Sequence, residues 1–289
     1  TARWRDGGPE VDGIPRPQPD QPVLIVAFEG WNDAADAATG AADHLLRIGA
    51  AERFAAIDPE DFFDFTATRP ISKLDGDGRR ELHWPTNAFS SLTLPGGPDI
   101  VVLRGVEPQL RWRTFCAQVI EVCTALRVRL VLTLGSLLAD VAHTRPTPVF
   151  GTAEDERVIE ALHLERSRYE GPTGIVGVLH QCCAEAGVNS AALWAAVPSY
   201  VAAAPSPKAA LALVDRTTAL LGLTVDVDDL KLSTGAYEHQ ISELVTEDDE
   251  TAAYVGHLEA AHDTDEVAVS SADDLVAEVE RFLRDQRGN

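Results

Sequence analysis

The sequence of 289 residues contains no methionine and only three lysines, which stand beside twenty-one arginines. The missing methionine includes an initiator, which indicates that residue 1 is not the translated start. Basic residues are scarce as a class, because 24 Lys and Arg oppose 46 Asp and Glu, and the formal net charge is -22. Nucleic acids and anionic membranes attract basic surfaces. The charge balance therefore argues against both as partners.

Long apolar runs are also missing, since no stretch reaches the eighteen residues of a membrane span. The first twenty residues have neither the basic nor the apolar part of a secretory signal, so we expect a cytoplasmic protein. Cysteines are few: Cys116, Cys123 and the adjacent pair Cys182 and Cys183. Their spacing is not C-x-x-C, so it indicates neither a zinc site nor a redox motif. We expect reduced, mostly buried thiols, no metal and no cofactor.

Four continuous apolar runs have the length of buried strands, and they occupy residues 22–28, 99–105, 128–135 and 190–198. Helical patterns follow at 33–48, 109–126, 173–187 and 207–221. Strands that alternate with helices predict an α/β fold, with a mostly parallel sheet and helices on both faces. Shorter strand patterns at 53–58, 63–70, 80–85 and 147–152 predict an antiparallel extension of this sheet or a side hairpin.

The chain divides into three regions by composition. Residues 1–21 are rich in Pro and Gly and predict an extended arm, and residues 22–224 carry the α/β pattern of a core domain. Residues 225–289 contain eighteen Asp and Glu against four Lys and Arg. We predict two acidic helices there, Ile241 to Ala261 and Ala272 to Arg284, as a C-terminal helical extension.

The chain becomes polar directly after its first apolar run, at Glu29-Gly30-Trp31-Asn32-Asp33. In a doubly wound sheet, ligands bind outside the carboxyl ends of the strands. Gly30 permits a tight turn, and Asn32 or Asp33 is placed to cap the next helix. A plain turn with a buried Trp and a ligand site both remain open for the segment. We favour a function for Glu29, because a carboxylate after a buried strand needs a partner.

Two further candidates lie in the segment 134–148. Ser136, Asp140 and His143 are the residue types of a catalytic triad. The second Gly of the nucleophile elbow is missing after Ser136, so a structural role for these three is favoured. Arg145, held between Thr and Pro, is a better candidate for a clamp that binds an anion or a carboxylate.

Thr173 and Tyr200 complete the candidates. Thr173 stands at a predicted helix start, where free N–H groups favour an anion, although tight packing explains the pattern equally well. Tyr200 follows the last apolar run and is expected in a pocket wall, in a subunit contact or as a cover of the sheet. The carboxylates of residues 57–65 suit a solvated turn better than a metal site, because aromatic residues separate them.

Several long blocks in one order resemble the proteasome assembly chaperone family, in the branch found in actinobacteria. The blocks are FEGWNDAADAATGAADHLL, IDPEDFFDFTATRP, HWPT, RGVEPQLRW, LGSLLADVAHTRPTPV, ERSRYEGPTGIVGVLH and LWAAVPSYVAAAPSPKA, and the resemblance covers residues 22–260. It implies a fold similar to nucleoside phosphorylases and peptidyl-tRNA hydrolases, with a C-terminal helical extension. It also implies homo-oligomers, as trimers, and proteasome α-subunits as partners without known catalysis.

The resemblance fails at the extreme C-terminus. Family members in eukaryotes and archaea often end in a hydrophobic-Tyr-any tripeptide that docks between α-subunits. This sequence ends in Arg287-Gly288-Asn289, which removes that contact.

Two hypotheses from different classes follow. The first is a non-catalytic, chaperone-like homo-oligomer that contacts a protein partner, and no complete catalytic motif contradicts it. The second is a small-molecule-binding protein or enzyme with a nucleoside- or carboxylate-type ligand in a pocket at the carboxyl ends of the strands. Its pocket would combine the eight candidates Glu29, Trp31, Asn32, Asp33, Ser136, Arg145, Thr173 and Tyr200. We favour the first hypothesis.

Overall fold

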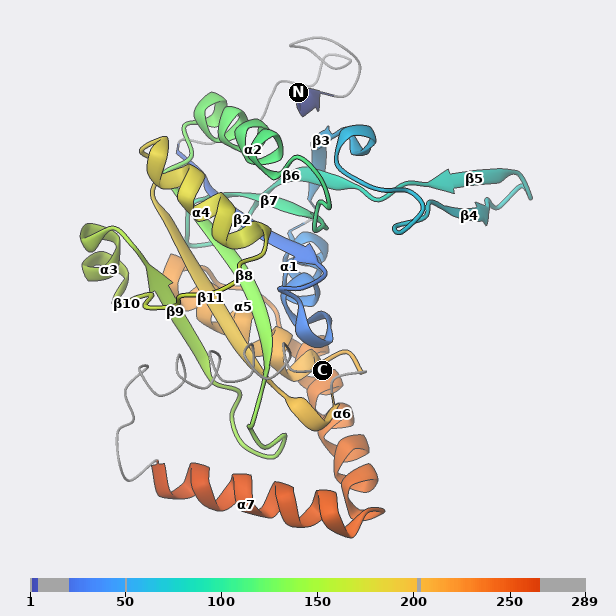
Figure 1. Cartoon of the computed structure of the whole chain (residues 1–289), viewed down its shortest axis with the longest axis vertical. Helices are drawn as coiled ribbons and strands as arrows, with labels where there is room; N and C mark the ends of the chain where they lie inside the picture. Colours follow the sequence, from blue (N-terminus) through green and yellow to red (C-terminus); the bar gives the residue numbers. More distant parts are fainter. Residues whose placement is uncertain (1, 5–20, 50, 202–203, 266–289) are drawn as a thin grey trace.

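A computed structural model describes residues 2–4, 21–49, 51–201 and 204–265 of the chain (Figure 1). Its centre is a nine-stranded sheet with the order β1-β3-β6-β7-β2-β8-β11-β9-β10. The strands, in that order, are Ala2–Trp4, Glu52–Ile57, Asn87–Thr93, Asp99–Val106, Val23–Glu29, Leu130–Ala139, Ser190–Pro198, Val149–Ala153 and Glu165–Arg166. The four central strands, β7, β2, β8 and β11, are mutually parallel and are the four predicted apolar runs. The predicted α/β fold is confirmed.

Antiparallel strands extend the parallel centre on both sides. β6 pairs antiparallel with β7 and with β3, and β9 pairs antiparallel with β11. The short patterns at 53–58 and 147–152 therefore predicted the extension correctly. The pattern at 63–70 did not form a strand, because the Asp64 carboxylate accepts hydrogen bonds from the Thr66 amide and hydroxyl and closes a turn.

Helices cover both faces of the sheet, and alternate residues of β2 face opposite layers. On one face Val23, Ile25 and Ala27 pack with α1 and α5; on the other, Leu24 and its alternating neighbours pack with α2 and α4. The helices are α1 (Ala37–Ile48), α2 (Trp112–Leu126), α3 (Glu156–Leu162), α4 (Ile175–Glu185) and α5 (Pro207–Leu221). We refer to the side with α2 and α4 as the α4 face. Burial on both faces explains why the central strands are continuously apolar.

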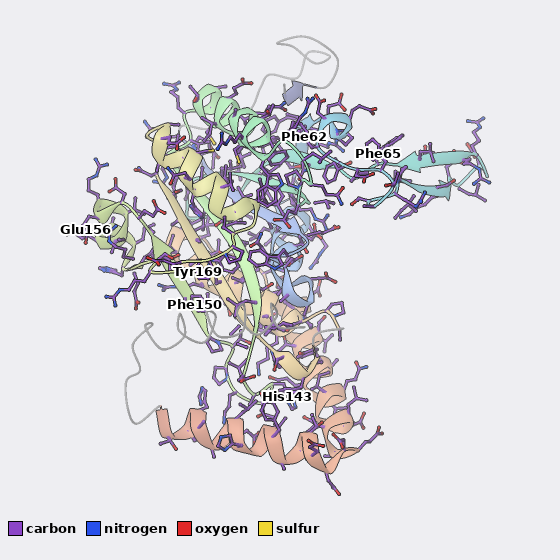
Figure 2. The ribbon with its side chains drawn as sticks, in the orientation of Figure 1. Phe62, Phe65, His143, Phe150, Glu156 and Tyr169 are labelled. Atoms are coloured by element: carbon purple, nitrogen blue, oxygen red, sulfur yellow. The ribbon has the colours of Figure 1, made fainter. Side chains whose placement is uncertain are left out.

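A two-stranded hairpin, β4 (Ile71–Leu74) and β5 (Arg80–His83), projects from the body of the molecule (Figure 1). Residues on either side of it belong to the body. Phe62 is buried beneath α2 against Phe115, with ring centroids 5.4 Å apart, and Phe65 packs on Trp84 at the base of the hairpin (Figure 2).

The C-terminal region contributes two helices, α6 (Asp228–Thr246) and α7 (Asp249–Asp265). The prediction of one helix from Ile241 to Ala261 is wrong, because the helical structure is interrupted between the end of α6 at Thr246 and the start of α7 at Asp249. Asp248 favours the start of α7, since its carboxylate accepts a hydrogen bond from the Thr251 amide as an N-cap residue does. The predicted helix from Ala272 to Arg284 lies outside the described residues. None of the described helices combines the length and the hydropathy that crossing a membrane requires.

Candidate functional site

The polar turn after β2 is bound to the start of α4 by Glu107, which directly follows β7. The Glu107 carboxylate accepts hydrogen bonds from the Ile175 amide at 2.9 Å, from Asn32 Nδ2 at 3.3 Å and from the Trp31 amide at 3.4 Å. A Cβ on Gly174 would lie 2.8 Å from Glu107 Oε1, so glycine permits this close approach. The carboxylate satisfies a free amide at the helix start and favours the helix dipole.

The Asp33 carboxylate caps the first turn of α1 with its side chain, although Asp36 occupies the N-cap position of that helix. Its Oδ1 accepts hydrogen bonds from the amides of Ala38 at 2.8 Å and Thr39 at 3.1 Å, and its Oδ2 accepts one from the Thr39 hydroxyl. Burial raises the pKa of this carboxyl above its usual range, although the hydrogen bonds from Thr39 and Ala38 lower it.

Ser136 lies within β8 and not beyond its end, because the strand continues to Ala139. The prediction that Ser136 follows a strand is therefore wrong. Its hydroxyl donates to the Ala34 carbonyl at 2.9 Å and its amide donates to the Asn32 carbonyl at 2.9 Å. These bonds fasten the turn after β2 to the neighbouring strand. The Ser136 hydroxyl is thus engaged with the backbone and is not paired with a general base.

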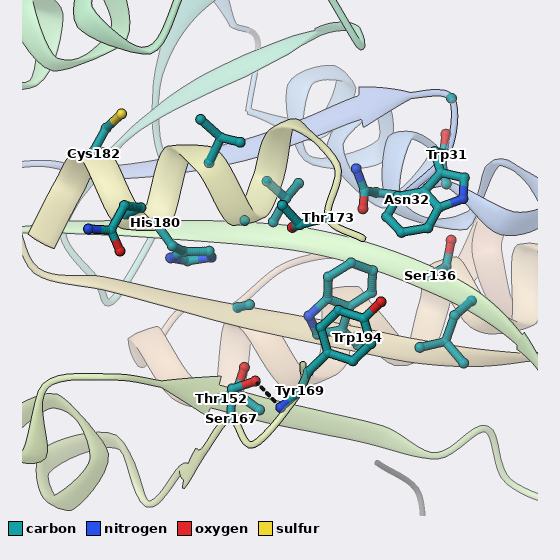
Figure 3. A pocket seen from close by; sticks show the side chains of 18 of the residues that line it. Trp31, Asn32, Ser136, Thr152, Ser167, Tyr169, Thr173, His180, Cys182 and Trp194 are labelled. Carbon is teal, nitrogen blue, oxygen red and sulfur yellow. Dashed lines mark hydrogen bonds between the residues drawn. The ribbon is translucent and has the colours of Figure 1, made fainter. Parts of the chain in front are cut away.

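A cavity of about 1910 Å³ opens on the α4 face, where residues of α2, of α4 and of the strands β8, β11 and β9 line it (Figure 3). We refer to it as the α4 cavity. Its aromatic lining comes from Trp31, Phe150, Tyr169 and Trp194. Trp194 lies flat on β8, since a Cβ on Gly135 would stand 2.5 Å from two atoms of its ring. Gly135 is therefore required for the position of the indole.

The polar lining of the α4 cavity includes an enclosed histidine. His180 Nε2 is hydrogen bonded to the Thr133 hydroxyl and Nδ1 to the Ser190 hydroxyl, each at 2.9 Å. Burial lowers the pKa of His180 to about 4, so the imidazole is neutral at physiological pH. Thr173 also lines the cavity and packs against Gly177, where no Cβ would fit.

Glu29 lies on the opposite face of the sheet, where its carboxylate is paired with Arg104. Its carboxylate accepts a hydrogen bond from Arg104 Nη1 at 2.5 Å, and the same guanidinium donates two hydrogen bonds to Asp43 of α1. The three side chains join β2, β7 and α1. The requirement for a partner was predicted correctly, but the partner is internal.

Arg145 and Tyr200 lie together at the C-terminal helices, away from the α4 cavity. Arg145 binds both carboxylate oxygens of Asp263 on α7, through Nε at 2.7 Å and Nη2 at 2.8 Å. The predicted carboxylate clamp therefore holds a carboxylate of its own chain. Tyr200 packs edge-on against His143 and against Tyr254 of α7. His143 lies between the sheet and α7 (Figure 2).

His143 is the centre of a polar cluster that holds the C-terminal helices to the core. Its Nδ1 and amide are hydrogen bonded to the Tyr200 hydroxyl at 2.8 Å, and Nε2 to the Ser242 hydroxyl of α6 at 3.0 Å. Its carbonyl accepts a hydrogen bond from Lys208, which also binds Glu238, each at 2.5 Å. Burial, and then the charge of Lys208, lowers the pKa of His143.

Five of the eight predicted residues thus line the α4 cavity: Trp31, Asn32, Asp33, Ser136 and Thr173. The prediction missed Glu107, Tyr169, His180 and Trp194. Glu107 carried a usable signal, because it follows a buried strand just as Glu29 does. In the described part of the chain, no cluster of His, Cys, Asp and Glu is large enough to bind a metal.

Comparison with known proteins gives the family. The model of the PAC2 family matches residues 27–245. A PAC2 family protein from Streptomyces avermitilis is 45% identical with a TM-score of 0.76, over 81% of this chain and 99% of that one. A proteasome-assembly chaperone homologue from Mycobacterium tuberculosis is 43% identical with a TM-score of 0.73, over the same shares.

Another M. tuberculosis structure, of unknown function, is 27% identical with a TM-score of 0.82, over 98% of this chain and 99% of that one. A comparison with curated protein sequences finds no match. The resemblance to the proteasome assembly chaperone family is confirmed, because the family model and two relatives above 40% identity agree over most of the sequence. The chain belongs to the PAC2 family.

Proposed function

We propose that this protein is a non-catalytic, chaperone-like interaction protein that acts as a cytoplasmic homo-oligomer, a trimer. Its partner in this proposal is the proteasome α-subunit or another protein. The observation that carries it is the 43% identity with a proteasome-assembly chaperone homologue, 99% of which is covered. Reduced thiols agree with a cytoplasmic location, since the four cysteines are free.

The chemistry of the turn after β2 supports an interaction protein over an enzyme. Ser136 donates its hydroxyl to a backbone carbonyl, Asp33 caps a helix, and Glu107 joins a turn to a helix start. Each of these groups satisfies backbone or neighbouring polar atoms. A nucleophile needs a base within hydrogen-bonding distance, and Ser136 has a carbonyl there instead.

The experiment is to mix the purified protein with proteasome α-subunits and to follow ring assembly by native electrophoresis. We expect faster formation of α-rings, or a stable complex with them. If the full chain leaves both the rate and the yield of rings unchanged, the proteasome partner is rejected.

A second candidate function, binding of a nucleoside- or carboxylate-type small molecule, is supported by the α4 cavity with its aromatic lining. Calorimetry with a nucleoside panel on the full chain and on Trp194→Ala tests it. Heat of binding that disappears in the variant supports the candidate. No heat with any nucleoside removes the nucleoside version of this candidate.

A further inference from the structure

The four cysteines of the chain meet where α2 packs against α4. Cys116 and Cys123 are buried on α2, two helical turns apart. Cys182 and Cys183 are adjacent residues of α4. All four belong to, or pack against, the same hydrophobic cluster on the α4 face. Four thiols from two distant parts of the sequence are therefore gathered at one contact between two helices.

Cys182 differs from the other three cysteines, because it is only partly buried. Cys116, Cys123 and Cys183 are at most 1% exposed, whereas Cys182 lines the α4 cavity. Figure 3 shows Cys182 and His180 on opposite sides of α4. A buried cysteine packs as a small apolar side chain, which accounts for three of the four. A small reagent can reach the fourth, and thiol reactivity depends on such access.

Cys116 lies directly against Cys182. The two thiols are hydrogen bonded to each other across the helix contact, and Cys183 interacts electrostatically with both Cys116 and Cys123. Burial, and then the neighbouring thiols, raises the pKa of the Cys116 thiol above its usual range. Cys116 is therefore a protonated, shielded thiol that touches the accessible one.

We propose that Cys182 is a site of oxidation by peroxides and that Cys116 is its resolving partner, so that the oxidised protein carries a disulfide between α2 and α4. Disulfides of cytosolic proteins are usually transient, and they serve catalysis or redox sensing. The inference goes beyond the proposed function and does not depend on its protein partner.

The reaction consumes one hydrogen peroxide in two steps. The Cys182 thiolate attacks a peroxide oxygen, an S–O bond forms as the O–O bond breaks, and the departing hydroxide takes up a proton to become water. The Cys116 sulfur then attacks the sulfur of the Cys182 sulfenic acid. An S–S bond forms, the S–O bond breaks, and the hydroxyl leaves as water with the Cys116 proton. The second step is intramolecular, so proximity offsets the raised pKa of Cys116.

The disulfide would cross-link two helices that both contribute to the lining of the α4 cavity. The start of α4 is already fixed, because the Ile175 amide donates a hydrogen bond to Glu107. The new bond would fix α4 a second time, near its end. A cross-link restricts the unfolded chain more than the folded one. We expect oxidation to raise Tm by roughly 5–10 °C, and a thiol reductant to reverse the rise.

The test compares the full chain with Cys182→Ser, Cys116→Ala and the matched control Cys123→Ala, which changes an equally buried cysteine of α2. Each protein is treated with a small excess of hydrogen peroxide, unfolded and alkylated. Mass spectrometry then counts the free thiols and identifies cross-linked peptides. Circular dichroism before oxidation checks that each variant is folded.

We expect the wild type and Cys123→Ala each to lose two free thiols and to gain one cross-link, between positions 116 and 182. Cys182→Ser should form no cross-link. Cys116→Ala should form none either, and its Cys182 should accumulate as a sulfenic acid that dimedone labels. This last result separates a resolving thiol from a thiol that only packs beside Cys182.

Four free thiols in the wild type, under conditions that oxidise free cysteine completely, would overturn the inference. A disulfide between another pair or between two molecules would do the same, as would oxidation of Cys182 to a sulfinic acid without a cross-link. A cross-link that lowers Tm would also overturn it, since the folded state would then have to distort. The assembly of α-rings is measured on the reduced protein, so its result is independent of this one.

Discussion

The cap of α1 gives the sharpest test of the local physics. Asp33→Ala leaves the Ala38 and Thr39 amides and the Thr39 hydroxyl without their acceptor in a buried place. Losing a helix cap costs about 1 kcal/mol and each buried unsatisfied donor adds about 1 kcal/mol or more. We expect unfolding free energy to fall by roughly 2–4 kcal/mol, and Tm to fall by roughly 5–10 °C.

Asp33→Asn is the matched control, because its amide oxygen still accepts from both amides. Burial raises the pKa of Asp33, so the neutral Asn removes a desolvation penalty and should cost less than about 1 kcal/mol. Urea titrations of wild type and both variants measure the difference. An Ala variant within about 0.5 kcal/mol of wild type, the range of an ordinary surface change, would refute the reasoning.

The wild type and Asp33→Asn should also differ in how their unfolding free energy depends on pH. A carboxyl with a raised native pKa binds more protons when folded, so its contribution to stability is full below the unfolded value of 3.8. That contribution is lost as pH rises through the native pKa. The difference in unfolding free energy should therefore move in favour of Asp33→Asn between pH 4 and pH 7.

Three further predictions follow from the described contacts. His180 has a native pKa of about 4, against 6.5 in the unfolded chain. The unfolding free energy of the wild type should therefore fall by up to about 3 kcal/mol as pH drops from 7 toward 4. Urea titrations of His180→Gln should lack this part of the decline. A double-mutant cycle between Arg145→Ala and Asp263→Ala should give a coupling of at most about 1 kcal/mol, because the pair is partly exposed, with faster hydrogen exchange in α7. Gly135→Ala should displace the indole of Trp194, cost about 1–3 kcal/mol in thermal unfolding and shift the tryptophan emission, which Gly76→Ala should leave unchanged.

The core of the fold was predictable because its strands are buried on both faces. Val23–Glu29 and its parallel neighbours read as unbroken apolar runs, and the α5 range Pro207–Leu221 was bounded by a Ser cap and a Gly stop. The edges were harder. Ile71–Leu74 lies in an exposed hairpin with no buried face, so no pattern of burial marks it as a strand.

The site was predictable only in part, because the side chains at the strand ends were assumed to face the same side of the sheet. Glu29 follows β2 but belongs to the face of Ala27, opposite the α4 cavity, since side chains alternate along a strand. Arg145 was predicted to clamp an anionic ligand, whereas its guanidinium binds the carboxylate of Asp263 on α7, 118 residues later. Trp194 sits inside a strand, where a sequence gives no sign that an indole faces a cavity.

The register of the central strands has a consequence for synthesis. β2 pairs with β7 and β8, and both partners are synthesised after it. Val23 can pair with Ile100 only when β7 has been made, and with Leu130 only when β8 has been made. At a translation rate of about 5–20 residues per second, the seven residues of β2 are exposed for roughly 5–20 s before their second neighbour exists. This apolar strand has two unpaired edges until β7 is made, and one unpaired edge until β8 is made. A nascent chain of this protein is thus itself exposed to aggregation, and non-local pairing of this kind slows folding.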